Sequence, residues 1–346
     1  MKISTKRIKG VLGLIGVLFL LAPLTVFAAN KVVVIPLFGD NPAQPLKNVI
    51  TVAKANGKFT DPVAAVNSIT DASATNPYLV VIGPGVYTIT QTLVMKPYVD
   101  IVGSGENVTT ITGAISTVSP STSAIIKGAD YSALSSLTVS NYGAGTYSIG
   151  LYNLGVANMT VSAVTFYAGN GTQARAVHNE DSDHITLTHV TTKASTGTTL
   201  IGVYNKNSLS IKLTGLYAVI SGGTNNFGVH NVSSSACSMN DVDANIFGGT
   251  NNYAVYNNNS SCVMNNLSVW SSAGTGNNYG VYNDSSSPRI QRSTIFGSIG
   301  LYTVGGTTTV SQSTIMNGIE GTGAKTCVAC DNGSGKALDG DCVVIP

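Results

Sequence analysis

The sequence has few charged residues: Asp, Glu, Lys and Arg together make up only 10% of its 346 positions. It contains no concentrated basic stretch of the kind that nucleic-acid binding requires, so we expect no nucleic-acid partner. Abundant Gly, Ser, Thr and Asn take the place of charge, and the 43% apolar content excludes a disordered chain. Uncharged polar residues for the surface and aliphatic residues for the core are together typical of an all-β protein.

Long hydrophobic runs are also missing. The apolar run Val11–Leu24 is shorter than the ~18–20 residues that span a membrane. It is flanked by small residues at Val26 and Ala28, and it follows the basic residues Lys2, Lys6, Arg7 and Lys9. We therefore expect residues 1–28 to be a signal peptide cleaved near Ala28, leaving a secreted, extracellular or periplasmic protein without a membrane span. The alternative is an uncleaved membrane anchor. Cleavage leaves 14 basic and 16 acidic residues, so the net charge becomes −2.

No repeat contains a helical stripe of apolar residues; a five-residue pattern recurs instead. Ile-Gly-Leu-Tyr-Asn at 149–153 returns every 26 residues, with copies starting at 175, 201, 227, 253 and 279. A weaker copy lies at 123–127, and a last one, at 299–303, follows after only 20 residues. A second pattern, such as Met159-x-Val161-x-x-Val164, indicates two short strands hinged by a turn. Three short strands per repeat predict a solenoid whose coils bury their apolar faces against one another.

The positions of the five-residue pattern predict which side chains face the core. Position 3 is always Leu or Val, from Leu151 to Leu301, and must face inward. Strict alternation then places positions 1 and 5 inward and positions 2 and 4 outward. Position 5 is expected to form an inward ladder of amides between coils, made by Asn153, Asn179, Asn205, Asn231, Asn257 and Asn283.

The fourth position is the predicted binding surface. Its column holds Tyr152, His178, Tyr204, His230, Tyr256 and Tyr282. Aromatic rings beside a column of Gly and Ala suit stacking on sugar rings or docking of another protein. We therefore expect a polysaccharide or a surface protein as the partner. The alternative is an aromatic ladder that only supports itself, or one covered by the loops 222–226, 248–252 and 274–278.

One coil carries a group of ionisable residues after its pattern. Asp181, Asp183 and His184, helped by Arg175, are the candidate catalytic residues if the protein is an enzyme. Hydrolysis of a glycosidic bond needs paired carboxylates. No second carboxylate stacks here, because the residues 26 positions after Glu180, Asp181, Asp183 and His184 are Lys206, Asn207, Leu209 and Ser210. Glu180 and Lys206 are expected to pair across coils, whereas Arg175 at an inward position has no sequence explanation.

Five cysteines are present in a chain expected to enter an oxidising compartment. Cys237 and Cys262 are about one coil apart and could form a bridge, but we expect buried thiols. Cys327, Cys330 and Cys342 are the disulfide candidates, in a C-terminal cap over 321–346. A structural zinc would need a fourth ligand. We expect no metal and no cofactor, with calcium possible only if the protein is a lyase.

The region before the repeats has its own signals. A strand is expected at Lys31–Phe38, within a leader over 29–60 that is irregular from Gly39 onward. Asp61 followed by Pro62 is typical of a helix start, so a short helix at 61–71 is expected to cap the solenoid, which extends over 61–320.

The segment 60–113 resembles the opening of pectinesterases and other pectate-lyase-like proteins. The resemblance rests on Gly85-Val86-Tyr87, on Val102-Gly103-Ser104-Gly105 and on Thr110-Ile111-Thr112-Gly113. It implies a right-handed parallel β-helix and a link to polysaccharides. The family's catalytic signatures are absent; for example, Asn245-Ile246-Phe247-Gly248 lacks the acid of the pectinesterase motif. The sequence therefore predicts a non-catalytic binding protein. The alternatives are a lyase, hydrolase or esterase of this superfamily with a non-standard site, and a purely structural rod.

Overall fold

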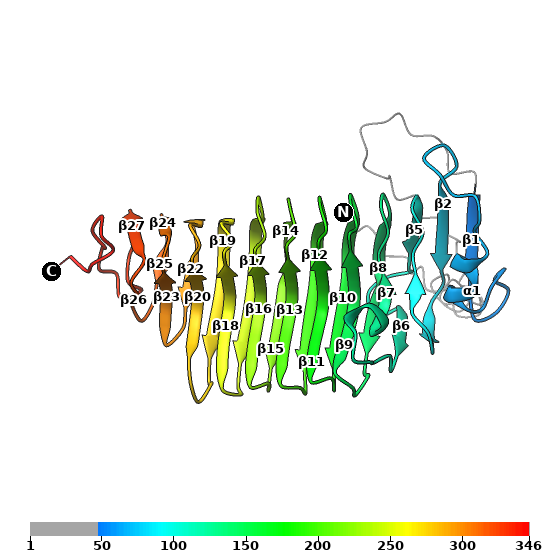
Figure 1. The fold of residues 1–346 in the computed structure, drawn as a ribbon, viewed down its shortest axis with the longest axis horizontal. Coiled ribbons are helices and arrows are strands. Elements are labelled where there is room, and N and C mark those ends of the chain that lie inside the picture. Colours follow the sequence, from blue (N-terminus) through cyan, green and yellow to red (C-terminus); the bar gives the residue numbers. More distant parts are fainter. Residues whose placement is uncertain (1–47, 346) are drawn as a thin grey trace, which may run out of the picture. The chain divides into compact units, whose positions relative to one another are not determined.

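The computed structural model describes residues 48–345, which form a parallel β-helix (Figure 1). Strands one coil apart pair in parallel, so Arg175 lies between Ile149 of the preceding coil and Ile201 of the next. The fold class predicted from the repeat is therefore confirmed. The expected signal peptide and the strand expected at Lys31–Phe38 lie outside the described residues.

Two sheets run along the stack of coils. The ten-stranded sheet takes one strand from each coil: β4 (Leu93–Val94), β7 (Ala124–Lys127), β9 (Tyr147–Leu154), β11 (Gln173–Glu180), β13 (Thr199–Lys206), β16 (Asn225–Val232), β18 (Asn251–Asn258), β20 (Asn278–Asp284), β23 (Ile299–Val304) and β26 (Ile319–Glu320). The eight strands from β7 to β23 in this sheet carry the five-residue pattern. The structure aligns Ala124, not Ser123, with Ile149, so the weak first copy starts one residue later than the sequence suggests.

The seventeen-stranded sheet holds the remaining strands. They are β1 (Asn48–Val52), β2 (Tyr78–Ile82), β3 (Gly85–Thr88), β5 (Val99–Val102), β6 (Thr109–Gly113), β8 (Ala133–Asn141), β10 (Thr160–Gly169), β12 (Thr186–Ser195), β14 (Lys212–Thr214), β15 (Tyr217–Ser221), β17 (Ser238–Phe247), β19 (Val263–Ser272), β21 (Arg289–Gln291), β22 (Thr294–Phe296), β24 (Thr307–Ser311), β25 (Thr314–Ile315) and β27 (Ala324–Val328). The predicted hinge is present, because Ala163, His189 and Asp241 each adopt a positive φ in mid-strand.

The first coil starts earlier than the sequence indicates. Strand β1 lies inside the segment expected to be irregular and pairs with β2 over its whole length. Its alternation of exposed Val49 and Thr51 with buried Ile50 and Val52 is the pattern of a half-buried strand. Helix α1 (Pro62–Asn67) follows, with the Asp61 side chain accepting a hydrogen bond from the Val63 amide at 2.9 Å. It packs against β1, β2 and β4 and is shorter than expected.

Strict alternation fails inside the five-residue pattern, and this overturns two predictions. In the pairing of β11 with β13, Arg175 is paired with Ile201 and Val177 with Val203. Ala176, at position 2 between them, is not paired. This local break resembles a β-bulge and shifts the alternation by one residue. Position 2 therefore faces inward: Ala176 belongs to the main core, whereas the buried Ile201 and Phe227 of position 1 do not. Positions 1 and 4 face outward.

The predicted amide ladder is confirmed. Each side-chain amide from Asn153 to Asn257 donates to the Asn one coil later at 2.8–2.9 Å, and Asn283 closes the series on Thr308 at 3.1 Å. A second ladder, Asn226–Asn252–Asn278, was not anticipated. These buried bonds fix the register of one coil on the next, because slipping would leave amides unpaired.

Two disulfides pin the C-terminal half. Cys327 and Cys342 form the bridge expected in the cap, and Cys330 remains a buried free thiol. The expectation of thiols at Cys237 and Cys262 is wrong, because these residues are bonded to each other. Their Cα atoms lie 4.8 Å apart on neighbouring coils, and this spacing lets the two side chains meet.

Candidate functional site

Two rows of side chains cover the outer face of the ten-stranded sheet. Rings that are neighbours along the fourth-position row, from Tyr152 to Tyr302, have centroids 4.8–5.2 Å apart. The two rows also touch, since Phe227 stacks on His230 at 4.6 Å. The aromatic strip, as we call the partly open part of this face, consists of Tyr204, His230, Tyr253, Tyr256, Tyr279, Tyr282 and Tyr302, with the buried Phe227 packed among them.

The other end of this face is closed. Ile149 and Tyr152 are 0% and 3% exposed, and with Ala124 and Tyr147 they form an apolar cluster separate from the main core. The short 3₁₀ helix η1 (Pro120–Thr122) packs against β7 and β9 beside them. His178 on the next coil is 1% exposed. The prediction of an open binding surface is therefore wrong at Tyr152 and His178.

Arg175 lies at the boundary between the closed end and the aromatic strip. Its side chain is 8% exposed, with Cζ 4.5 Å from the ring centroid of Tyr204 and 5.1 Å from that of Tyr147. Nη1 is 3.1 Å from Nδ1 of His178, and Nη2 donates to Gln173 Oε1 at 2.5 Å. Within residues 48–345, the buried Nε has no hydrogen-bond partner. Because position 1 faces outward, this arginine no longer occupies an anomalous inward position.

His178 is held neutral by this environment. Burial, followed by the positive charges of Arg175 and Lys206, lowers the pKa of His178 to about 2. A guanidinium can only donate hydrogen bonds, so Nδ1 must be the unprotonated, accepting nitrogen. The proton of the neutral ring then resides on Nε2, which is 3.5 Å from Glu180 Oε2.

Glu180 joins three coils. It accepts hydrogen bonds from Tyr152 Oη at 2.8 Å and from Lys206 Nζ at 2.6 Å, which confirms the expected pair with Lys206. Burial by itself would raise the pKa of Glu180, but these two hydrogen bonds keep that pKa below its usual value. Burial and the bond to Glu180 raise the pKa of Tyr152. The carboxylate is therefore an ionised acceptor facing a protonated tyrosine.

The other candidate catalytic residues do not join this cluster. Asp181 and His184 lie in the turn after β11 and have positive φ values of 51° and 52°. The equivalent residues one coil later, Asn207 and Ser210, also have positive φ values. Asp181 accepts from Asn207 at 3.2 Å, and Asp183 contacts His184 at 2.8 Å on the exposed surface. No described hydrogen bond or ion pair connects Arg175 to any of the three. A joint catalytic role of Arg175 with these three residues therefore stays a prediction.

Sequence reasoning missed the two contacts that organise this cluster, Arg175 with His178 and Tyr152 with Glu180. The available signal was the one charged side chain in a row otherwise made of Ile, Phe and Tyr. The assumption of strict alternation placed that row in the core, so it did not indicate that Arg175 faces outward toward His178.

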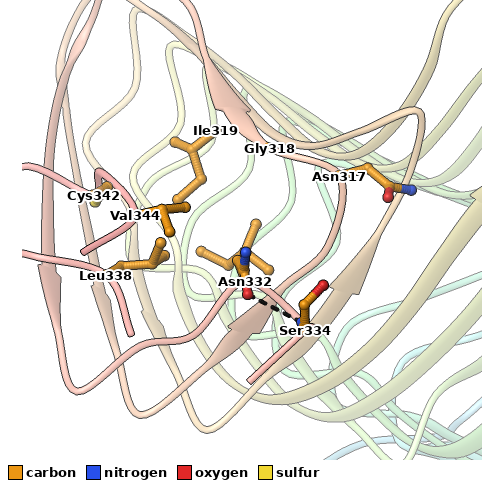
Figure 2. A pocket seen from close by; sticks show the side chains of 9 residues that line it. Asn317, Gly318, Ile319, Asn332, Ser334, Leu338, Cys342 and Val344 are labelled. Atoms are coloured by element: carbon orange, nitrogen blue, oxygen red, sulfur yellow. Dashed lines mark hydrogen bonds between the residues drawn. The ribbon is translucent and has the colours of Figure 1, made fainter. Parts of the chain in front are cut away.

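A hollow of about 240 Å³ lies under the C-terminal cap (Figure 2). It is lined by Ile315, Asn317, Gly318, Ile319, Asn332, Ser334, Leu338, Cys342 and Val344. Asn332 Oδ1 accepts a hydrogen bond from the Ser334 amide at 3.0 Å, the dashed line in Figure 2. The hollow is smaller than the ~300–1,000 Å³ typical of small-molecule sites. We treat it as a packing gap between the last coils and the cap.

Residues 48–345 contain no group of three or more His, Cys, Asp or Glu side chains placed to hold a metal ion. None of the helices among them has the length and apolarity to cross a membrane.

No protein-family model and no curated protein sequence matches this chain. Solved structures do resemble it. The polygalacturonase from Erwinia carotovora ssp. carotovora is 13% identical with a TM-score of 0.52, over 86% of this chain and 96% of that one. The catalytic domain of a GH87 α-1,3-glucanase in complex with tetrasaccharides is 12% identical with a TM-score of 0.54. That match covers 86% of this chain and 66% of the glucanase domain.

A third similar structure is ORF18 of Geobacillus virus E2, at 11% identity and a TM-score of 0.46, over 84% of this chain. This chain spans 63% of the length of that protein, just under two thirds. The polygalacturonase and glucanase matches show the shared fold, the parallel β-helix that the segment 60–113 suggested. At these identities they say nothing about activity.

Proposed function

We propose that this protein is secreted and binds polysaccharide, without cleaving it, along the aromatic strip. The observation that carries the proposal is the unbroken sequence of partly exposed rings from Tyr204 to Tyr302 on one sheet face. Tyr offers apolar area together with a hydroxyl group, which suits the faces and edges of sugar rings. Structural neighbours that act on polysaccharide, a polygalacturonase and a glucanase, support the ligand class by analogy of fold.

The test is a glycan array probed with the mature protein and with a variant carrying Tyr204→Ala, Tyr256→Ala and Tyr282→Ala. We expect the wild type to bind at least one polysaccharide and the variant to lose that binding. A matched control replaces Tyr142, Tyr217 and Trp270, exposed aromatic residues outside the strip, with Ala. Equal binding by the strip variant would refute the proposal. Binding of a protein and of no glycan would favour a surface-protein partner, and binding of neither would favour a structural rod.

A second candidate function is catalysis on polysaccharide, and the Tyr152–Glu180–Lys206 contacts favour it. An ionised carboxylate beside a tyrosine and a lysine is a set of proton-transfer groups. Access argues against it, because Tyr152 is almost completely buried. Incubation with a panel of acidic polysaccharides, with and without calcium, decides the matter. Cleavage that disappears in Glu180→Gln would replace the binding proposal with an enzymatic one.

A further inference from the structure

The geometry points to Arg175 as an anion-recognition residue that receives the carboxylate-bearing end of a saccharide chain lying on the aromatic strip. This inference rests on the proposed function and specifies which part of the ligand is recognised. It concerns a residue that the repeat cannot explain, because the neighbouring coils have Ile149 and Ile201 in the same place.

The first reason is that no described carboxylate bonds the guanidinium directly, although the charge of Glu180 acts on it from nearby. A guanidinium has five N–H donors, and the described contacts engage only Nη1 and Nη2, both with neutral groups. The nearby carboxylate of Glu180 is already occupied by Tyr152 and Lys206. Burying a cation without a paired anion is costly, and the buried Nε without a partner adds to that cost. An incoming anion would relieve it.

The second reason is the match of shape. The planar fork of an arginine side chain pairs with a carboxylate through two parallel hydrogen bonds. The rings of Tyr147 and Tyr204 lie against this fork and orient it. A sugar stacked near Tyr204 would therefore place a carboxylate within reach of a pre-oriented partner.

The third reason is position along the face. Beyond Arg175 the surface is filled by Ile149, Tyr152 and Tyr147, with η1 packed beside them. On the other side the partly open rings continue from Tyr204 toward Tyr302. We therefore expect a chain on the strip to end at Arg175, so that this residue meets a terminal unit and not an internal one.

The test compares saccharides that differ only in one acid. The probes are a glucose oligosaccharide, the same oligosaccharide with glucuronate at its non-reducing end or an aldonic acid at its reducing end, and a polymer with glucuronate only at internal positions. We expect the wild type to bind one acid-terminated oligosaccharide about 10- to 100-fold more tightly than the neutral one. We expect no such gain for the internal acid.

The variant Arg175→Ile adopts the residue that the flanking coils already have, so the fold has a precedent for it. It should lose the preference for the acid and keep the affinity for the neutral oligosaccharide. The control Lys193→Val removes a cation from the other sheet, at a row where the next coil has Val219, and should keep the preference. A preference that survives in Arg175→Ile would overturn the inference.

The wild-type data alone also decide, should Arg175→Ile fail to fold. The inference would be refuted if strip-dependent binding had equal affinity for acid-terminated and neutral oligosaccharides. It would also be refuted if the polymer with internal glucuronate bound as tightly as the acid-terminated oligosaccharide. Either result would leave the proposed function standing. Absence of any strip-dependent saccharide binding would instead refute the proposed function, and the inference with it.

Discussion

Arg175 and His178 are three residues apart in one strand, yet Nη1 of one lies 3.1 Å from Nδ1 of the other on the same face. In a regular strand, residues three apart point to opposite faces. The contact is therefore direct evidence of the break at position 2, which turns positions 1 and 4 to the same side. The functional face of this protein depends on that break.

Substitutions on either side of the break should have opposite outcomes. Gly228 is an inward position 2, where a Cβ would already lie 3.1 Å from Ala244 and from Ile246. We expect Gly228→Leu to overpack the core and to lower the free energy of unfolding by about 1–3 kcal/mol or more. Phe227→Ile, one residue earlier and facing outward, should cost much less, because Ile201 occupies that row. Urea denaturation of both variants measures the difference, and equal losses would contradict the assigned orientation.

Stability should fall below pH 6.5 because of His178. Its folded-state pKa of about 2 lies below the unfolded value of 6.5, so in this window only the unfolded state binds the proton. Stability from this group is therefore complete above pH 6.5. Below pH 6.5, this contribution to the free energy of unfolding decreases by up to about 1.4 kcal/mol for each pH unit of acidification.

The variant His178→Tyr isolates the pH dependence that His178 causes. The fold should accept this tyrosine, because Tyr152 and Tyr204 occupy the same row on the flanking coils. Burial raises the pKa of Asp100 to about 6, which produces an opposite slope in both proteins and cancels in their difference. Denaturation at pH 7.0, 6.0 and 5.0 should show that the wild type loses more stability on acidification than His178→Tyr does. Parallel pH curves would mean that His178 is not buried as a neutral ring.

The amide ladder should be essential to stability. Asn231→Leu leaves the amide of Asn205 and the oxygen of Asn257 buried without partners. At about 1–3 kcal/mol for each unsatisfied group, we expect a loss of about 2–6 kcal/mol, measured by thermal or urea denaturation. The matched control is Asn258→Leu, because Val232 already places an apolar residue in that row. An unchanged melting temperature for Asn231→Leu would argue against the ladder's structural role.

Peptide mapping of the non-reduced protein should recover Cys237 joined to Cys262 and Cys327 joined to Cys342. Cys330 should react with an alkylating reagent only after unfolding, because it is 3% exposed. Replacing Cys237 and Cys262 together with Ala should cost about 2–4 kcal/mol of stability. A peptide that links Cys330 to either cap cysteine would contradict this pairing.

The sequence alone determines the architecture. Leu or Val at position 3 and Asn at position 5 recur because every coil must bury the same row and satisfy the same turn. The period therefore reveals the stack, the core row and the amide ladder. A disulfide between Cys237 and Cys262 could not be settled in this way, because spacing alone allows a bridge without requiring one.

Tertiary structure decides what faces outward and what remains accessible. A one-residue break in alternation leaves no mark in the period, yet it moves Arg175 from an apparent core position to the outer face. The apolar cluster around Tyr147 comes from contacts between coils, which no single repeat encodes. It buries Tyr152 and leaves the fourth-position rings from Tyr204 onward partly open. Repetition fixes the solenoid, whereas departures from repetition, which act only through neighbouring coils, determine where it can bind.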